Sequence, residues 1–150
     1  MVGVGHPLRG DDYVGSYVAK NILRQTNSDM REGAYVFDAE AYIEVFITKL
    51  ADLDPKHVIF IDACEINATP GEARLLSMAE TGYPFFTTHA IPLKVLAEKL
   101  LPKSRVWVLA IQPRKTEFGE EMSSEVRDAA VSISEFMALN VAKEERTIAD

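Results

Sequence analysis

Apolar and polar side chains alternate along this chain in two rhythms, one typical of helices and one typical of buried strands. Apolar residues that recur every three or four positions predict helices near residues 12–25, 42–53, 93–100 and 126–137. Short, largely apolar runs predict strands at residues 1–4, 34–38, 58–62 and 106–111. Strand and helix therefore alternate along the chain.

This alternation predicts an α/β fold, a three-layer sandwich whose mostly parallel, twisted sheet has helices on both faces. The Pro70-Gly71 pair predicts a turn, around which residues 63–67 and 73–78 are expected to form a hairpin-like excursion. Residues 1–150 are expected to form a single domain. The polar residues 140–150 are expected to form a frayed tail.

Composition narrows the function classes. The chain has 150 residues, 47% of them hydrophobic, and a formal net charge of −7 without a basic stripe, which makes nucleic acid a poor partner. No apolar run reaches the roughly 18–20 residues that a membrane span needs, and the N-terminus lacks a signal-peptide pattern. Cys64 is the only cysteine, so no internal disulfide can form. These features lead us to expect a cytoplasmic protein without membrane contact.

The residues that follow the strands are the first candidates for chemistry, because ligands of such sheets bind beyond the carboxyl ends of the strands. Asp12 comes after the first strand, Asp62 ends the third, and His89 precedes the third helix. Aspartate and histidine suit a divalent cation such as zinc, nickel, manganese or iron, and three ligands leave positions open for substrate or water. The sequence thus predicts one site containing Asp12, Asp62 and His89.

Each of these residues also has a structural explanation. Asp11 or Asp12 could cap the first helix, Asp62 could bind turn amides, and His89 could bond a backbone carbonyl. Two other functions stay open at this point. One is a thiol hydrolase built from Cys64 and His89, and the other is a receiver-like signalling module that uses the acid pair and Asp62.

Several separated blocks of the sequence resemble one known family, the hydrogenase maturation endopeptidases, and they occur in the same order along most of the chain. The blocks are Gly3-Val4-Gly5-His6-Pro7-Leu8-Arg9-Gly10-Asp11-Asp12, Asp62-Ala63 with Thr69-Pro70-Gly71-Glu72, Phe86-Thr87-Thr88-His89-Ala90-Ile91-Pro92-Leu93, and Ile111-Gln112-Pro113. The block around His89 is similar to the branch that processes hydrogenase-3-type and related archaeal enzymes.

The resemblance implies a specific reaction. The family removes a C-terminal extension from the large-subunit precursor of a nickel–iron hydrogenase after nickel has been inserted. Its metal-contacting positions fall on Asp12, Asp62 and His89, and the nickel is carried by the substrate, so no permanent cofactor is expected. The partner implied is the hydrogenase large-subunit precursor.

The chain also departs from the family pattern. His6 stands where the family usually has Asn, and Tyr13 where it has Gly. An Asp-Gly-Gly-Thr-like block appears here as Asp38-Ala39-Glu40-Ala41, which leaves a family member with a changed target as a further alternative. We expect four residues at this edge to bind substrate: Asp38, Glu40, Thr88 and Gln112.

Overall fold

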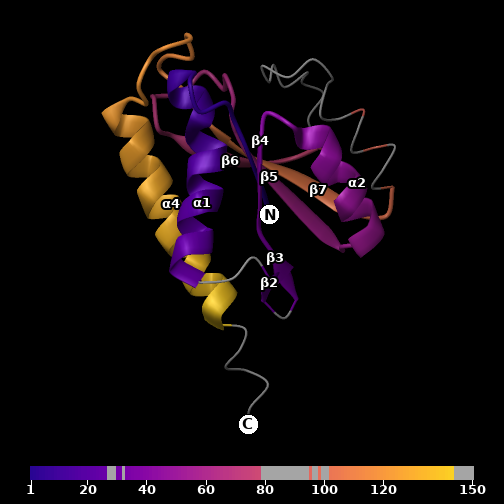
Figure 1. Ribbon diagram of the computed structural model, residues 1–150. Coiled ribbons are helices and arrows are strands. Elements are labelled where there is room, and N and C mark those ends of the chain that lie inside the picture. The colour runs from indigo at the N-terminus through magenta and orange to yellow at the C-terminus, as the bar shows by residue number, and fades with distance from the viewer. Residues whose placement is uncertain (27–29, 32, 79–94, 96–97, 99–101, 144–150) are drawn as a thin grey trace.

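The computed structural model describes residues 1–26, 30–31, 33–78, 95, 98 and 102–143. Its main sheet has five strands in the order β4-β1-β5-β7-β6 (Figure 1). The strands are β1 (Val2–Val4), β4 (Phe37–Glu40), β5 (His57–Ala63), β6 (Ala73–Ser77) and β7 (Arg105–Ile111). All neighbours pair in parallel except β6, which pairs antiparallel with β7. Two short strands, β2 (Met30–Arg31) and β3 (Ala34–Tyr35), form a separate antiparallel pair.

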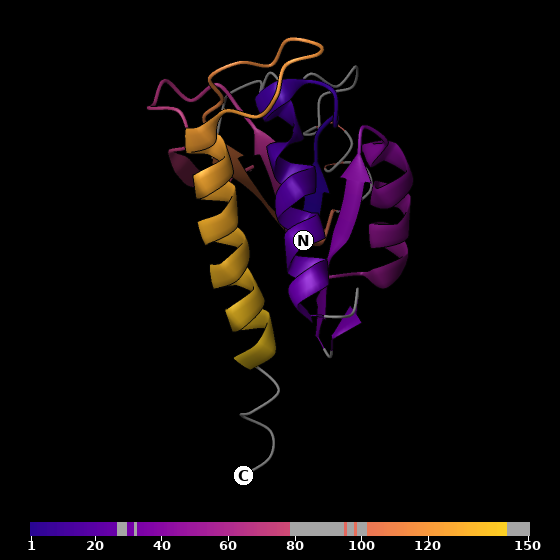
Figure 2. The same ribbon diagram turned by 60° about the vertical axis from the view of Figure 1, so that its left-hand side comes forward.

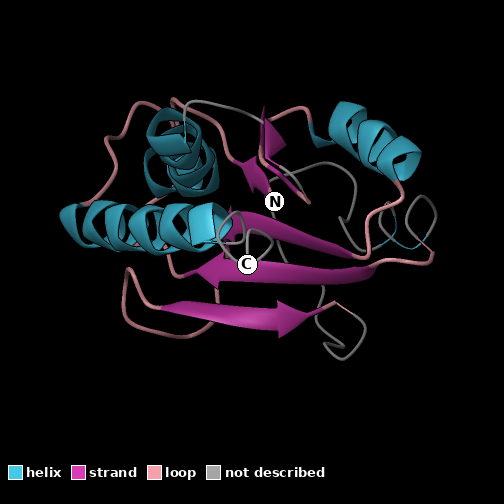
Figure 3. Ribbon diagram, turned by 90° about the horizontal axis from the view of Figure 1, so that it is seen from below, coloured by secondary structure: helices cyan, strands magenta, loops and turns pink. Residues whose placement is uncertain are grey.

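Helices cover both faces of this sheet. A 3-10 turn, η1 (Gly10–Tyr13), leads into α1 (Val14–Thr26), which packs beside α4 (Ser124–Lys143) on one face. Helix α2 (Ile43–Leu53) covers the other face (Figures 1 and 2). Viewed from below, β6 forms the edge of the sheet farthest from α2 (Figure 3).

Each face has its own apolar core. The face under α2 buries Phe60 and Val108 against Ile43 and Ile47 of the helix. The opposite face buries residues of α1, β5, β7 and α4, namely Val14, Val18, Ile22, Ile61, Ile111, Val126 and Ala130. Alternate residues of β5 therefore serve opposite cores, which explains the continuous apolar run along that strand.

The predicted α/β sandwich is confirmed, and three details differ from the sequence interpretation. The hairpin-like excursion is wrong, because residues 73–77 form an edge strand on β7 while the residues after Ala63 form no strand. The expected strand at 34–38 is divided between β3 and β4. Helix α4 continues through Lys143, so the expected frayed tail does not begin at residue 140. The predicted helix at 93–100 lies almost entirely outside the described residues.

Gly15 sets the height of α1 above the sheet. A Cβ atom at this position would lie 1.8 Å from the carbonyl oxygen of Ile61 and 2.4 Å from that of Val4. The missing side chain lets the first turn of α1 rest directly on β1 and β5. This close approach brings η1 to the carboxyl edge of the sheet.

Within the described part of the chain, none of the helices combines the length and apolarity that a membrane crossing requires.

We expect Gly15→Ala to destabilise the protein by at least about 3 kcal/mol, because the new methyl group meets two backbone carbonyls that cannot rotate away. Denaturant unfolding measures this loss. In a helix where the new methyl group meets no other atoms, Gly→Ala raises the free energy of unfolding by about 0.5–1 kcal/mol. A decrease for Gly15→Ala would therefore itself indicate a steric clash. Arg24→Ala, at an exposed position of the same helix, is the control and should change stability by less than about 0.5 kcal/mol. A neutral or stabilising Gly15→Ala would contradict the close approach.

Candidate active site

Asp62 is the buried acid at the carboxyl end of β5, and its side chain is 1% exposed. Its Oδ1 accepts a hydrogen bond from the Ala63 amide at 2.9 Å. Its Oδ2 is buried and has no hydrogen-bond partner among the described residues. A buried carboxylate oxygen without a donor among these residues is costly to maintain, so the atom needs a partner that lies outside them.

Asp12 lies in η1, beside the same edge of the sheet, and is 2% exposed. Its Oδ2 accepts a hydrogen bond from the backbone N–H of His6 at 2.9 Å. Gly5 precedes His6 with a φ of 145°, and a Cβ atom on Gly5 would lie 1.9 Å from the carbonyl oxygen of Asp12. The loop after β1 therefore folds tightly back on η1 and holds the Asp12 carboxylate in place.

The two acids affect each other electrostatically. Desolvation raises the pKa of Asp62 well above its ordinary value, and the negative charge of Asp12 raises it further. The hydrogen bond from Ala63 opposes these effects without cancelling them. The site thus favours a proton on Asp62, and a cation placed between the carboxylates would remove the reason for that proton.

The third predicted ligand, His89, and the predicted substrate-binding residue Thr88 lie outside the described residues. Within the described residues, no group of three or more histidine, cysteine or acidic side chains is arranged to hold a metal ion. The described structure therefore places two of the three predicted ligands at one edge, and the role of His89 stays a prediction.

Cys64 lies two residues beyond Asp62 and is 2% exposed. Burial raises the pKa of its thiol, and the charge of Asp62 raises it further. The thiol therefore stays protonated at neutral pH, whereas a nucleophilic cysteine needs its thiolate form. This environment disfavours the thiol hydrolase that the sequence left open.

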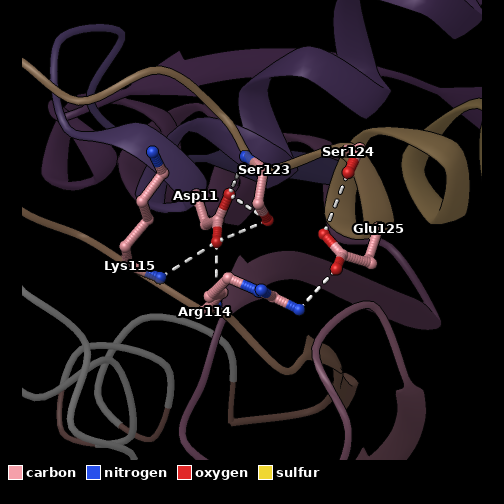
Figure 4. Close-up of polar contacts among 6 residues, drawn as sticks. All are labelled: Asp11, Arg114, Lys115, Ser123, Ser124 and Glu125. Atoms are coloured by element: carbon pink, nitrogen blue, oxygen red, sulfur yellow. Dashed lines mark hydrogen bonds and ion pairs between the residues drawn. The ribbon is translucent and has the colours of Figure 1, made fainter.

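Asp11, adjacent to Asp12, clamps the loop that follows β7. Its carboxylate accepts hydrogen bonds from the backbone N–H groups of Arg114 at 2.7 Å, Lys115 at 3.0 Å and Ser123 at 2.6 Å (Figure 4). The Ser123 hydroxyl donates to it as well, at 2.9 Å. The residue before η1 is Arg9, and no side chain caps this 3-10 turn. Asp11 thus anchors the loop after β7, and Asp12 is the candidate site residue.

Asp38 and Glu40, which we expected to bind substrate, both pair with Lys20 of α1. The Lys20 ammonium lies 3.3 Å from Asp38 Oδ2 and 2.9 Å from Glu40 Oε1, and it donates to the Tyr13 hydroxyl at 3.1 Å. Desolvation alone would lower the pKa of Lys20, but these hydrogen bonds and the charge of Asp38 together raise it. Ser16 also donates to Asp38.

Sequence reasoning missed Lys20. The available signal was its place on α1, seven residues after Tyr13 and so on the same side of the helix. Two departures from the family pattern, Tyr13 and Glu40, converge on this lysine. Substrate contact by Asp38 and Glu40 stays a prediction.

Gln112, also expected to bind substrate, holds the loop after β5. Its Oε1 accepts hydrogen bonds from the backbone N–H groups of Ile66 at 2.9 Å and Ala68 at 3.2 Å. Its Nε2 donates to the carbonyl of Pro113 at 3.0 Å. The side chain is 4% exposed, so its observed task is to shape the loop, and substrate contact stays a prediction.

Comparison with known proteins gives consistent matches. A family model described as hydrogenase maturation protease matches residues 17–139, a segment that contains Asp62 and follows Asp12. The hydrogenase 3 maturation protease of Escherichia coli strain K12 is 27% identical over 135 residues, which are 89% of this chain and 84% of that protein.

Solved structures agree in fold. The crystal structure of the [NiFe] hydrogenase maturation protease HycI from Thermococcus kodakarensis KOD1 has a TM-score of 0.82 and 26% identity, and the match covers 95% of this chain and 90% of that one. The solution structure of the endopeptidase HycI from Escherichia coli has a TM-score of 0.75 and 27% identity, covering 89% and 85% of the two chains.

We expect Asp62→Asn to stabilise the protein at pH 7 by about 1 kcal/mol or more. The raised pKa means that the folded state binds this proton more tightly than the unfolded state does. The stability from that proton is fully present below pH 3.8 and is lost as the pH rises toward the pKa of the folded state. Asparagine does not ionise, so its advantage should be small near pH 4 and grow toward pH 7.

Denaturant unfolding of both proteins at several pH values measures this difference. Asp128→Asn, at an exposed position on α4, is the control and should show no such growth. An Asp62→Asn difference that is the same at pH 4.5 and pH 7 would show that Asp62 ionises normally in the folded state.

We expect Asp11→Ala to lower the free energy of unfolding by about 3 kcal/mol or more, because it leaves several donors of the loop after β7 without their acceptor. Thermal or denaturant unfolding measures the effect. Asp128→Ala is the matched control and should stay within about 0.5 kcal/mol of the parent protein. A loss from Asp11→Ala as small as that of the control would mean that the clamp carries no stability.

Proposed function

Because the chain belongs to the hydrogenase maturation protease family, we propose that its substrate is the large-subunit precursor of a nickel–iron hydrogenase. The chain is a hydrolase of the endopeptidase type, and we assign it the removal of the precursor's C-terminal extension after nickel insertion. The likeness to the Escherichia coli hydrogenase 3 enzyme favours a hydrogenase-3-type precursor. The proposal treats residues 1–150 as one working domain in the cytoplasm.

Nickel enters this proposal as part of the substrate. The precursor brings the ion to the carboxyl edge of the sheet, where Asp12, Asp62 and His89 contact it. Carboxylate and imidazole groups are suitable ligands for nickel, and so few protein contacts leave the ion attached to its own subunit. Contact with nickel thereby lets the enzyme distinguish a nickel-loaded precursor from a nickel-free one.

One observation carries the proposal, namely that Asp62 Oδ2 is buried and has no hydrogen-bond partner in the part of the chain that the structure describes. The negative charge of Asp12, a second carboxylate, raises the pKa of Asp62 further. A divalent cation arriving with the substrate offsets both costs at once.

The reaction is the addition of water across a peptide bond. Contact with the nickel fixes the scissile bond near the carboxylates, and positioning of this kind can supply a large part of the rate acceleration. A carboxylate of the site accepts a proton from the attacking water, whose oxygen bonds to the carbonyl carbon. The C–N bond then breaks, and the departing amine takes the proton back from that carboxyl group, which is thereby regenerated as a carboxylate. Cys64 has no part in this scheme.

We expect wild-type protein to cleave a nickel-loaded precursor and to leave a nickel-free precursor intact. Asp12→Ala and Asp62→Asn should each lower the rate of nickel-dependent processing at least about 100-fold, because each removes a contact to the ion or the base. The size of the large subunit on a denaturing gel, followed over time, measures processing. His89→Gln should have a similar effect.

Two control variants complete the assay. Cys64→Ala should keep processing within a few-fold of wild type, and its failure in a folded protein would restore the thiol hydrolase. Asp128→Ala tests for general effects of removing an acid. If Asp12→Ala processed the nickel-loaded precursor at the wild-type rate, the assignment of the site would be wrong.

A further inference from the structure

Glu40, the last residue of β4, has a strained backbone conformation. Among described residues other than glycine, a positive φ occurs at Glu40 (47°), Asp54 (44°) and Asn67 (53°). Aspartate and asparagine tolerate this left-handed conformation because their short side chains can bond the nearby backbone. Glutamate has no such advantage, so some other contact must hold Glu40 in this conformation.

The backbone of Glu40 connects β4 to the loop that orients Asp12. The β1–β4 register shifts at this point, and the carbonyl of Glu40 accepts a hydrogen bond from the N–H of Gly5 at 2.9 Å. His6, the residue after Gly5, donates its backbone N–H to Asp12 Oδ2 at 2.9 Å. Only the Gly5–His6 peptide therefore separates the strained residue from the donor that holds the Asp12 carboxylate.

Lys20 provides the contact that Glu40 needs. Its ammonium group has three N–H bonds and three oxygen partners, on Glu40, Asp38 and Tyr13. Asp38 in turn accepts the backbone N–H of Glu40 at 3.2 Å through Oδ1. The lysine therefore holds Glu40 through its side chain directly and through its backbone by way of Asp38. The Lys20 side chain is 31% exposed, so part of this network is shielded from water.

We propose that Lys20 is a positioning residue: it locks Glu40 in the left-handed conformation and thereby fixes the Gly5–His6 segment that orients the Asp12 carboxylate. The effect on activity rests on the proposed function, in which Asp12 is a site residue. Lys20 itself touches neither the nickel nor the scissile bond in this account. Its action reaches the site through the backbone.

The first test needs no substrate. In Lys20→Met the side chain loses its ammonium group and keeps an unbranched chain that is one atom shorter. We expect hydrogen exchange of the His6 amide to become at least ten-fold faster. Lys20→Met/Glu40→Gly should restore slow exchange, because glycine adopts a φ of 47° without a partner. Lys20→Arg should also keep the amide protected. The Phe60 amide in β5 reports global opening, and Lys103→Met is an exposed-lysine control.

The second test uses the nickel-loaded precursor. Lys20→Met should lower kcat about ten-fold with little change in KM. The double variant should recover most of the lost kcat, and any rise in its KM reports the loss of the Glu40 side chain. Unchanged protection of the His6 amide in Lys20→Met would overturn the proposal. A Lys20→Met variant with a raised KM and an unchanged kcat would also overturn it, since Lys20 would then bind substrate directly.

The two proposals can fail separately. If Asp12→Ala processes the precursor normally, the proposed site is wrong, while the exchange experiment still decides whether Lys20 positions the Asp12 carboxylate. If Asp12→Ala is inactive and Lys20→Met keeps both full kcat and a protected His6 amide, only the positioning role is lost.

Discussion

Two carboxylates buried at one edge of the sheet are the constraint around which this structure is organised. Desolvation and the charge of Asp12 together raise the pKa of Asp62, and Asp62 Oδ2 has no donor within the described part of the chain. Such an arrangement costs folding free energy, and the surrounding packing and hydrogen bonds must offset it. Under the proposed function this cost has a use, because a cation brought by the substrate would meet two acids that are already desolvated and held in place.

The scaffold holds the acids by three different devices. Gly15 lets α1 rest on the sheet, so η1 reaches the end of β5. Asp11, the neighbour of Asp12, anchors the loop after β7 with hydrogen bonds to backbone N–H groups. Lys20 supports the left-handed Glu40, whose carbonyl holds the loop after β1. Each device acts through backbone atoms, which explains why residues outside the proposed chemistry can govern the geometry of the site.

Hydrophobic periodicity predicted the layers of the fold, because a strand such as β5 that is buried on both faces is a continuous apolar run. The rule that ligands bind beyond the carboxyl ends of parallel strands led us to expect Asp12 and Asp62 at one edge. Pairing of residues 73–77 with β7 was not predictable, because the sequence of a short strand does not specify which strand it pairs with. The tasks of Asp11 and Gln112 were equally hidden, since their partners are backbone groups that any sequence would offer. The Lys20 network depends on the conformation of Glu40, which side-chain patterns do not report.

The central claim is that Asp12 and Asp62 form one desolvated site. Carboxyl-carbon NMR of Asp62 as a function of pH tests it most directly, in the wild-type protein and in Asp12→Asn. We expect the wild-type carboxyl to titrate well above 3.8, its ordinary value, because it is desolvated and lies close to the charge of Asp12. Asp12→Asn should move the midpoint downward while desolvation keeps it above that value. A wild-type midpoint near 3.8, or one that Asp12→Asn leaves unchanged, would contradict the account.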